Sequence, residues 1–300
     1  MDRIQFLDKP LAAKAEITAA LDRACAQVEK NLPAFTYQYQ AASSTDLFYQ
    51  PIINMDWTNG FWTGEIWLAY EHTKKNIFKY AALIQVEDFY KRINEEFSVD
   101  HHDLGFLYSL SCVAGYKLTG DETAKKAAIM AAEKLITRFQ EKGEFIQAWG
   151  VYGTILSYQY TQDPEYLELF RHISDYYLRH LPKDLVPFWD FDFTDGSSEP
   201  RDSSSAAIVI CGFLEAAKVL DKEEAEYYTK LAYQMMKSLI DNYEVKDWDS
   251  TNGILLHSTY NRHTPTNTCR NKGVDECCSW GDYYYMEALT RMVTDWNRYW

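Results

Sequence analysis

The sequence of 300 residues contains no apolar run of the length that a membrane-spanning helix or a secretory signal peptide requires. Positive charge is also scarce. Thirty Lys and Arg stand against 44 Asp and Glu, for a net charge of −14 and an isoelectric point of about 5.0. A negative field of this size repels nucleic acids and anionic membranes, so neither is expected as a partner. We therefore expect a cytoplasmic protein; its oligomeric state is not determined by the sequence.

Metal and cofactor motifs are missing as well. None of the six cysteines forms a Cys-x-x-Cys pair, and Cys277 and Cys278 are adjacent, a spacing that does not suit a zinc site. Cys25, Cys112 and Cys211 fall within apolar helical patterns, where a free thiol packs as a small hydrophobic group. The sequence has no phosphate-binding glycine loop, metal-ligand cluster or nucleophile elbow. No metal or organic cofactor is predicted.

Apolar residues repeat with the 3.6-residue period of helices along most of the chain, and alternating strand patterns are scarce. No Gly/Ser linker divides the sequence, so one all-α domain over residues 1–300 is predicted. Helix starts are marked at Asp103, Asp163, Asp202 and Ser279. The predicted helices cover residues 11–31, 61–73, 76–97, 103–118, 122–140, 149–161, 164–181, 203–220, 222–243 and 280–297.

A weak internal repeat divides these helices into pairs. Tyr70–Thr73, Tyr116–Thr119 and Tyr158–Thr161 each end one helix before the next begins, and a looser copy ends at Asp221. The spacing suits a helix, a tight turn, a second helix and a return loop, so each unit is predicted to be an αα-hairpin. Five hairpins result if the first helix pairs with the last. A toroid of hairpins is the favoured arrangement, and an irregular helical bundle is the alternative.

Aromatic residues are abundant, with 23 Tyr and 9 Trp. Segments between the hairpins couple Trp, Asp, Gly or His near a helix start, as in Asp56–Gly64 and His101–Phe106. In a toroid such helix ends can line one mouth, where loops carry function. Trp57, Trp62 and Trp149 are candidates to stack on sugar rings there, because an aromatic face covers the apolar C–H surface of a sugar. Packing beneath the rim is the alternative.

Asp103 is the strongest candidate for chemistry. A general acid or base needs a carboxyl whose protonation is tuned by burial or by a second carboxylate, and His101, His102 and Phe106 are its neighbours in the sequence. The alternative is that Asp103 caps its helix by accepting backbone N–H bonds. Three weaker candidates are Asp190, Asp202 and Asp282. The last two stand at helix starts, where capping is again the favoured interpretation.

A long polar loop from about Asn261 to Asp275 contains the run Cys269-Arg-Asn-Lys-Gly273. Its two cations, Arg270 and Lys272, can bind a carboxylate or a sulfate. Because the chain as a whole is negative, an anionic sugar needs such local cations. A solvated surface loop is the alternative.

Taken together, these segments resemble the unsaturated glucuronyl hydrolases of glycoside hydrolase family 88. The resemblance covers essentially the whole chain. The motifs that carry it are Asp56-Trp-Thr-Asn-Gly-Phe-Trp62, His101-His-Asp-Leu-Gly-Phe-Leu-Tyr-Ser109, Gln147-Ala-Trp-Gly150, Arg201-Asp-Ser-Ser204 and Trp280-Gly-Asp-Tyr-Tyr-Tyr-Met-Glu-Ala-Leu289. The resemblance implies an (α/α)6 barrel that hydrates the C4=C5 bond of unsaturated uronic acids, which polysaccharide lyases leave on disaccharides. The final loop is most similar to that of bacterial members acting on chondroitin and hyaluronan disaccharides.

The resemblance also implies roles for individual residues. In this family an aspartate delivers a proton to the vinyl ether while water adds at C5, and the resulting hemiketal opens and releases the reducing sugar. By motif match, Asp103 is one of two key aspartates. Pocket residues are matched by Trp57, His102, Phe106, Trp149 and Tyr260. Lys272 matches a cation that contacts substrate sulfate in the chondroitin-type members. Arg270 and Asn267 stand near it in place of their serines, so no sulfate preference follows.

The sequence departs from the family pattern between Trp149 and Val151. Family members carry two Gln-Ala-Trp-Gly copies, separated by a hairpin that bears the second catalytic aspartate, whereas Gln147-Ala-Trp-Gly150 here serves as both copies. One hairpin is thus predicted to be missing, together with a pocket His, Gln, Arg and Trp. Its loss leaves two apolar faces that must meet each other or face solvent. A contracted ring of five hairpins is one outcome.

We therefore expect a glycosidase by family, with greatly reduced or no turnover in this chain. Unsaturated uronic-acid disaccharides are the expected ligands. Two alternatives stay open: an unsaturated rhamnogalacturonyl hydrolase that acts on pectin fragments, and a noncatalytic sugar-binding remnant.

Overall fold

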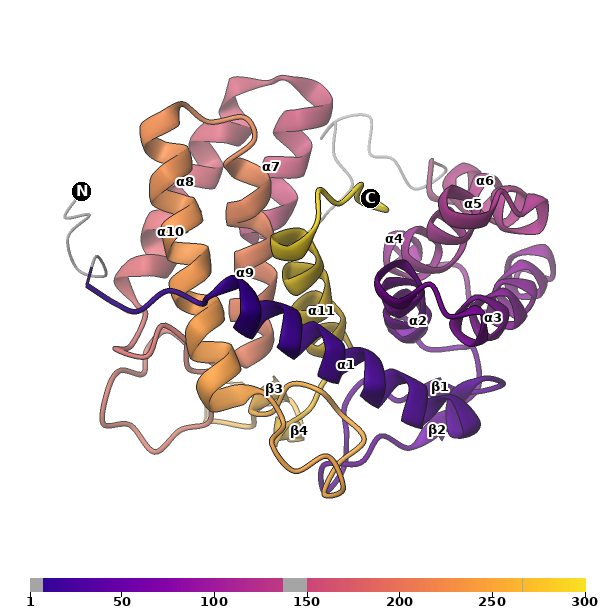
Figure 1. Cartoon of the computed structure of the whole chain (residues 1–300), viewed down its shortest axis with the longest axis horizontal. Helices are drawn as coiled ribbons and strands as arrows, with labels where there is room; N and C mark the ends of the chain where they lie inside the picture. Colours follow the sequence, from indigo (N-terminus) through magenta and orange to yellow (C-terminus); the bar gives the residue numbers. More distant parts are fainter. Residues whose placement is uncertain (1–7, 137–149, 266) are drawn as a thin grey trace.

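The computed structural model describes residues 8–136, 150–265 and 267–300. All ten predicted helical segments are present in these ranges (Figure 1). None of the helices there combines the length and the apolar character that a membrane span needs. The helices are α1 (Lys14–Phe35), α2 (Asn59–Thr73), α3 (Asn76–Asn94), α4 (Leu104–Tyr108), the π-helical η1 (Ser109–Val113), α5 (Ala114–Thr119), α6 (Glu122–Ile136), α7 (Gly150–Thr161), α8 (Pro164–Arg179), α9 (Ser203–Ala216), α10 (Lys222–Ser238), the π-helical η2 (Leu239–Tyr243) and α11 (Ser279–Val293).

Four short strands accompany the helices in the described ranges. They form two antiparallel pairs, β1 (Tyr39–Gln40) with β2 (Pro51–Ile52) and β3 (Ser258–Asn261) with β4 (Lys272–Glu276). The second pair corrects the prediction of one long polar loop over residues 261–275, because the two ends of that segment pair with each other.

Some predicted helix ends are displaced. α1 continues past Pro33 to Phe35, because a proline in the last turn removes only one backbone bond and Phe35 still packs into the core. α11 ends at Val293 rather than at residue 297, since Thr294 takes an extended backbone conformation that turns the chain away from the helix axis. The last residues of the helix predicted over 122–140 lie outside the described residues.

The predicted repeat marks three equivalent turns. In each, a threonine hydroxyl donates to the carbonyl four residues back and accepts the backbone N–H two residues ahead. These threonines are Thr73, Thr119 and Thr161. The next residue in each copy, Lys74, Gly120 or Gln162, has a left-handed φ of 58°, 71° or 59°. The hairpins α2/α3, α5/α6 and α7/α8 are thereby confirmed. The looser copy differs: Asp221 accepts the N–H of Glu224 as an N-cap.

The hairpins form an open ring in which α2, α4–α5, α7, α9 and α11 are the inner members. In space, neighbouring inner helices follow the order η1, α2, α11, α9 and α7, and α1 packs against α11 and α2 from outside. Between α7 and the α4–α6 group, the described residues make at most slight contact. Figure 1 shows the C-terminal segment in this space. The predicted incomplete toroid of five hairpins is therefore confirmed for the described part of the chain.

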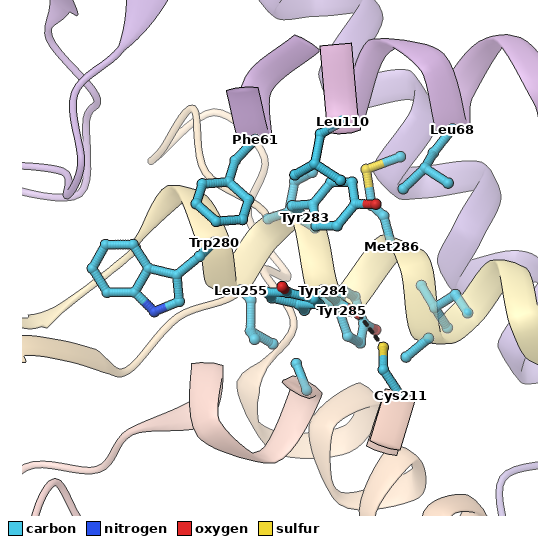
Figure 2. Packing of buried hydrophobic residues seen from close by; sticks show 14 of the residues in the cluster. Phe61, Leu68, Leu110, Cys211, Leu255, Trp280, Tyr283, Tyr284, Tyr285 and Met286 are labelled. Carbon is cyan, nitrogen blue, oxygen red and sulfur yellow. Dashed lines mark hydrogen bonds between the residues drawn. The ribbon is translucent and has the colours of Figure 1, made fainter. Parts of the chain in front are cut away.

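α11 is the helix around which the core is built. Every residue from Ser279 to Thr290 is buried, and the helix contacts α9, α2 and α1. Figure 2 shows Tyr283 directed towards Phe61 and Leu110, while Tyr284 lies on the side of α11 that faces Cys211. A helix buried on all sides must find partners for its polar groups within the protein.

The cysteines follow the prediction. All six are free thiols, and Cys25, Cys112 and Cys211 are buried within helices. Burial raises the pKa of both Cys25 and Cys112 to about 12, so these thiols stay protonated and pack as apolar groups.

Asp282 is a completely buried acid on α11. Its carboxylate accepts the backbone N–H groups of Ile254 (3.1 Å) and Leu255 (2.8 Å) and the hydroxyl of Tyr49 (3.0 Å). It therefore holds a loop from elsewhere in the chain, and the interpretation as a cap of its own helix is wrong. Burial raises the pKa of Asp282 to about 7, against the effect of these donors.

Glu65 on α2 is a second completely buried acid. Among the described residues, neither of its carboxylate oxygens has a hydrogen-bond partner. Burial, and then the negative charge of Asp282, raise the pKa of Glu65 well above its usual range. Because Asp282 has three donors and Glu65 has none, Glu65 is the member of the pair that holds a proton.

Replacing Glu65 with Gln is expected to flatten the pH dependence of stability. The unfolded chain releases the Glu65 proton at about pH 4.3, whereas the folded chain keeps it to a higher pH. The free energy of unfolding therefore falls as pH rises above that value, by at most about 1.4 kcal/mol per pH unit. Because glutamine cannot titrate, the free energy of unfolding of Glu65→Gln, measured by urea denaturation, should rise relative to that of the unmodified protein between about pH 5 and pH 8. Parallel stability curves for the two proteins would contradict this assignment.

Candidate active site

A pocket of about 290 Å³ lies inside the ring. Most of its lining comes from the first two turns of the inner helices and from residues just before them, and most of the side chains are aromatic or aliphatic. The lining residues are Trp57, Phe61, His102, Gly105, Phe106, Leu135, Tyr152, Gly153, Leu156, Ile208, Trp280, Tyr284 and Trp300. Neither Asp nor Glu is among these described lining residues. Such a surface suits the apolar faces of sugar rings better than a metal or a phosphate.

Trp57 is the centre of the aromatic wall. Its ring stacks on Trp280 with centroids 5.5 Å apart and meets Phe106 edge-on at 6.0 Å. Its indole N–H points to the hydroxyl of Tyr260 at 3.4 Å. Tyr260 packs edge-on against Trp280 at 5.0 Å. The structure thus brings Trp57, His102 and Phe106 into one wall, with Tyr260 beside it.

The other two candidate tryptophans do not belong to the described wall. Trp62 is completely buried and donates its indole N–H to the carbonyl of Phe35 (3.0 Å). The interpretation of Trp62 as a sugar-stacking residue is therefore wrong, and packing beneath the rim is right. Trp149 lies outside the described residues.

Asp103 stands at the N-cap position of α4, but its side chain accepts no backbone N–H there. The two carboxylate oxygens lie 3.4 Å from His101 Nδ1 and 3.4 Å from His102 Nε2, and the side chain is 16% exposed. His102 and Gly105, on either side of it in the sequence, line the pocket. The capping interpretation is wrong for Asp103, and its carboxylate lies between two histidines, one of which, His102, lines the pocket.

Arg92 on α3 fixes the two segments that carry Trp57 and His102. Its buried guanidinium donates to the backbone carbonyls of Asp56 (3.1 Å) and Ser98 (2.7 Å). Burial lowers the pKa of Arg92, and nearby acidic and phenolic groups oppose this effect. Sequence reasoning missed this residue because it lies on an outer helix with an ordinary apolar period.

Gly60 allows the same two segments to approach closely. A Cβ atom at this position would lie 2.1 Å from the carbonyl oxygen of Phe106 and 2.7 Å from the Cα of Leu107. Only glycine therefore permits the start of α2 to touch α4, which brings Trp57 next to Phe106.

Asp202 supports the wall from α9. Its carboxylate accepts the hydroxyl of Ser204 (2.6 Å), and the Ser204 oxygen accepts the indole N–H of Trp280 (3.0 Å). Burial raises the pKa of Asp202, and hydrogen bonds from Ser204 and nearby backbone groups oppose the shift. This chain of bonds orients Trp280 behind Trp57. Asp190 instead accepts the backbone N–H of Asp192 in a turn and does not line the pocket.

The predicted cations lie on or near the β3–β4 hairpin. Lys272 starts β4, and its ammonium nitrogen is 4.6 Å from the centroid of the Tyr260 ring, which places a positive charge beside the aromatic wall. Arg270 is exposed and does not line the pocket. Asn267 donates to the backbone carbonyl of Arg262 (3.0 Å) and so shapes the loop between the strands.

Several lining residues were not assigned to the pocket from the sequence. Trp280 and Tyr284 belong to a motif quoted above, which was a usable signal. Tyr152 and Trp300 had no such signal, because the helical period places Tyr152 inside α7 and says nothing of where residues 294–300 turn. Within the described ranges, no group of three or more His, Cys, Asp or Glu is arranged to hold a metal ion.

The chain is similar to bacterial hydrolases along its length. It is 35% identical to the unsaturated chondroitin disaccharide hydrolase of Streptococcus pneumoniae, in an alignment that covers 99% of this chain and 96% of that protein. It is 27% identical to the unsaturated glucuronyl hydrolase of a Bacillus species, over 90% of this chain and 95% of the relative. No protein-family model matches the chain.

Solved structures agree with these relatives. The crystal structure of the unsaturated glucuronyl hydrolase from Streptococcus agalactiae matches with a TM-score of 0.92 and 32% identity, over all of this chain and 97% of that one. An Asp-to-Asn variant of that enzyme, with a TM-score of 0.90, was solved in complex with dGlcA-GalNAc6S. The alignment with the Streptococcus pneumoniae protein extends over 388 positions, so at least 88 of them have no counterpart in these 300 residues. With 35% identity over nearly its whole length, the chain belongs to the family of unsaturated glucuronyl hydrolases.

Proposed function

We propose that the aromatic pocket binds an unsaturated uronic-acid disaccharide of the chondroitin type and that Asp103 is the group that protonates its C4=C5 bond. The observation that carries this proposal is the Asp103 carboxylate, which does not cap α4 and lies 3.4 Å from the pocket-lining His102. The names of the relatives and the disaccharide in the Streptococcus agalactiae complex support the substrate class.

In the proposed reaction the uronic ring stacks on the wall around Trp57, near His102, which lines the pocket, and Asp103 beside it. The carboxyl of Asp103 gives its proton to C4 and water adds its hydroxyl to C5, and the proton that the water loses returns to the Asp103 carboxylate. The product is a hemiketal at C5, which opens to a ketone and releases the reducing sugar. Lys272 beside Tyr260 supplies a positive charge for an anionic group of the ligand.

We further propose that turnover by this chain is greatly reduced, because one hairpin with the partner carboxylate is missing between Trp149 and Val151. Three observations support this. At least 88 positions of a relative have no counterpart here, the ring is open between the α4–α6 group and α7, and no Asp or Glu is among the described lining residues. A second carboxylate is a common way to tune an acid for proton transfer.

The first measurement is the loss of ultraviolet absorbance of the conjugated C4=C5 bond in unsaturated chondroitin and hyaluronan disaccharides. We expect a rate at least about 10²-fold below that of the Streptococcus pneumoniae relative, the lower end of what general acid–base catalysis contributes. Asp103→Asn should abolish what remains. A rate equal to that of the relative would refute the impairment, and turnover of pectin-derived disaccharides alone would favour the rhamnogalacturonyl alternative.

Binding is expected to survive where turnover does not. Calorimetry with the chondroitin disaccharide should show an affinity that Asp103→Asn leaves within about threefold and that Trp57→Ala lowers by about tenfold, because the ring loses its stacking surface. Trp189→Ala is the matched control, since Trp189 packs on Phe193 in a loop and does not line the pocket. The absence of any heat of binding would remove the sugar-binding proposal.

Inserting the corresponding hairpin of the Streptococcus pneumoniae relative between Trp149 and Val151 is expected to restore turnover. The inserted segment returns the partner carboxylate and fills the open side of the ring. The same absorbance assay measures the result, with a version of the insert whose aspartates are changed to asparagine as the control. A folded, inactive insertion protein would show that the missing hairpin is not the cause of the low rate.

A further inference from the structure

The C-terminal segment Thr294–Trp300 lies where the ring is open. After α11 ends, the segment runs through the space between α7 and the α4–α5 helices, as Figure 1 shows. Across this opening the helices make at most slight contact with each other in the described part of the chain. The segment therefore lies where a direct helix-to-helix contact would otherwise close the ring.

On one side of the opening, the segment is bonded to α2 and α5. The ammonium group of Lys117 donates to the backbone carbonyl of Arg298 (2.6 Å). The indole N–H of Trp296 donates to the carboxylate of Glu71 (2.9 Å), and the hydroxyl of Tyr299 donates to the same carboxylate. Lys117 thus bonds the segment to the edge at α5, and two aromatic residues bond it to one acceptor on α2, the next helix in the ring.

On the other side, the segment is bonded to α7 and α9. The guanidinium of Arg298 donates to the side chains of Gln159 and Glu215, and the Glu215 carboxylate is almost completely buried. The hydroxyl of Tyr160 donates to the backbone carbonyl of Trp300 (2.8 Å). Charged and polar bonds therefore join the segment to both edges, and Arg298 takes part on both sides.

Trp300 also enters the pocket. Its ring stacks on Tyr284 at 6.1 Å and 6° between planes, and it meets Phe106 edge-on at 5.9 Å and Tyr152 edge-on at 6.4 Å. Its indole N–H donates to the carboxylate of Glu287 (3.1 Å). Phe106 comes from α4 and Tyr152 from α7, so Trp300 contacts both edges of the opening inside the pocket itself.

We propose that residues 294–300 form a strap that holds the two edges of the open ring together and that Trp300 is the inner wall of the ligand pocket. The strap sets the separation between α4 and α7, and with it the distance between the pocket residues on these helices. The role of Trp300 in ligand binding rests on the proposed function, whereas the mechanical role of the strap does not.

The mechanical role is tested by the distance across the opening. Spin labels are placed at Glu122→Cys on α6 and Glu165→Cys on α8 in a Cys269→Ser background, since Cys269 is the one exposed cysteine. Double electron–electron resonance measures the distance between the labels. Arg298→Ala combined with Tyr160→Phe cuts the bonds to α7 and α9 and should widen the distance distribution. An unchanged distance distribution would overturn the proposed mechanical role of the strap.

Arg171→Ala is the matched control for this measurement. Arg171 also bonds a carboxylate through two guanidinium nitrogens, that of Glu224 at 3.0 and 2.8 Å, but it joins α8 to α10 away from the opening. It should leave the distribution unchanged. A widening in this control equal to that in the strap variant would overturn the proposal, because it would reflect general loosening of the hairpins.

The pocket role is tested by calorimetry with the unsaturated chondroitin disaccharide. Trp300→Ala should weaken binding about tenfold, whereas Trp300→Phe, which keeps a ring against Tyr284, should stay within about threefold of the unmodified chain. Equal affinity of Trp300→Ala and the unmodified chain for the disaccharide would overturn the proposed role of Trp300 as a wall of the pocket. If the unmodified chain binds no disaccharide, the proposed function fails. The distances between the spin labels still test the mechanical role of the strap.

Discussion

The complete burial of α11 is the constraint on which the rest of the structure depends. This helix contacts α9, α2 and α1, so it joins the two groups of hairpins on either side of it. Because no side of its first three turns faces water, its acidic groups need partners within the protein. Asp282 holds the loop at residues 254–255, and Glu287 binds Tyr152, Arg291 and Trp300. The acids of α11 thus connect the core to the pocket and to the C-terminal segment.

The open ring explains why the pocket has its particular lining. In a closed ring each inner helix has two inner neighbours, whereas α7 here lacks close contact with the α4–α6 group in the described part of the chain. Aromatic side chains from residues 296–300 occupy the opening and bring indole and phenol groups to the half-buried carboxylate of Glu71 and the buried carboxylate of Glu287. An open ring can therefore bury its apolar faces if another segment is bonded to both edges.

The candidate site separates the binding of a sugar from the chemistry of a sugar. Trp57, Phe106 and Trp280 form a wall whose geometry is fixed by Gly60, Arg92 and the Asp202–Ser204 bond. That wall is built entirely from contacts among the described residues. Proton transfer is more demanding, because the pKa of the carboxyl group must allow it both to hold and to release a proton. Asp103 has two histidines beside it, but the described pocket residues include no second carboxylate. We therefore expect affinity and turnover to depend on different residues.

The helical periods and the Tyr–Thr repeat in the sequence were sufficient to predict the ten helices and the hairpins, because these features depend on neighbours three or four residues apart. The family motifs likewise sufficed to predict that Trp57, His102 and Phe106 belong near Asp103. The sequence did not show whether the Asp103 carboxylate caps its helix or is left uncapped. Nor did it show whether Trp62 stacks on a sugar or packs beneath the rim. It also carried no sign that Trp300 enters the pocket. These outcomes depend on which distant backbone groups and rings approach each side chain, and only the tertiary packing decides that.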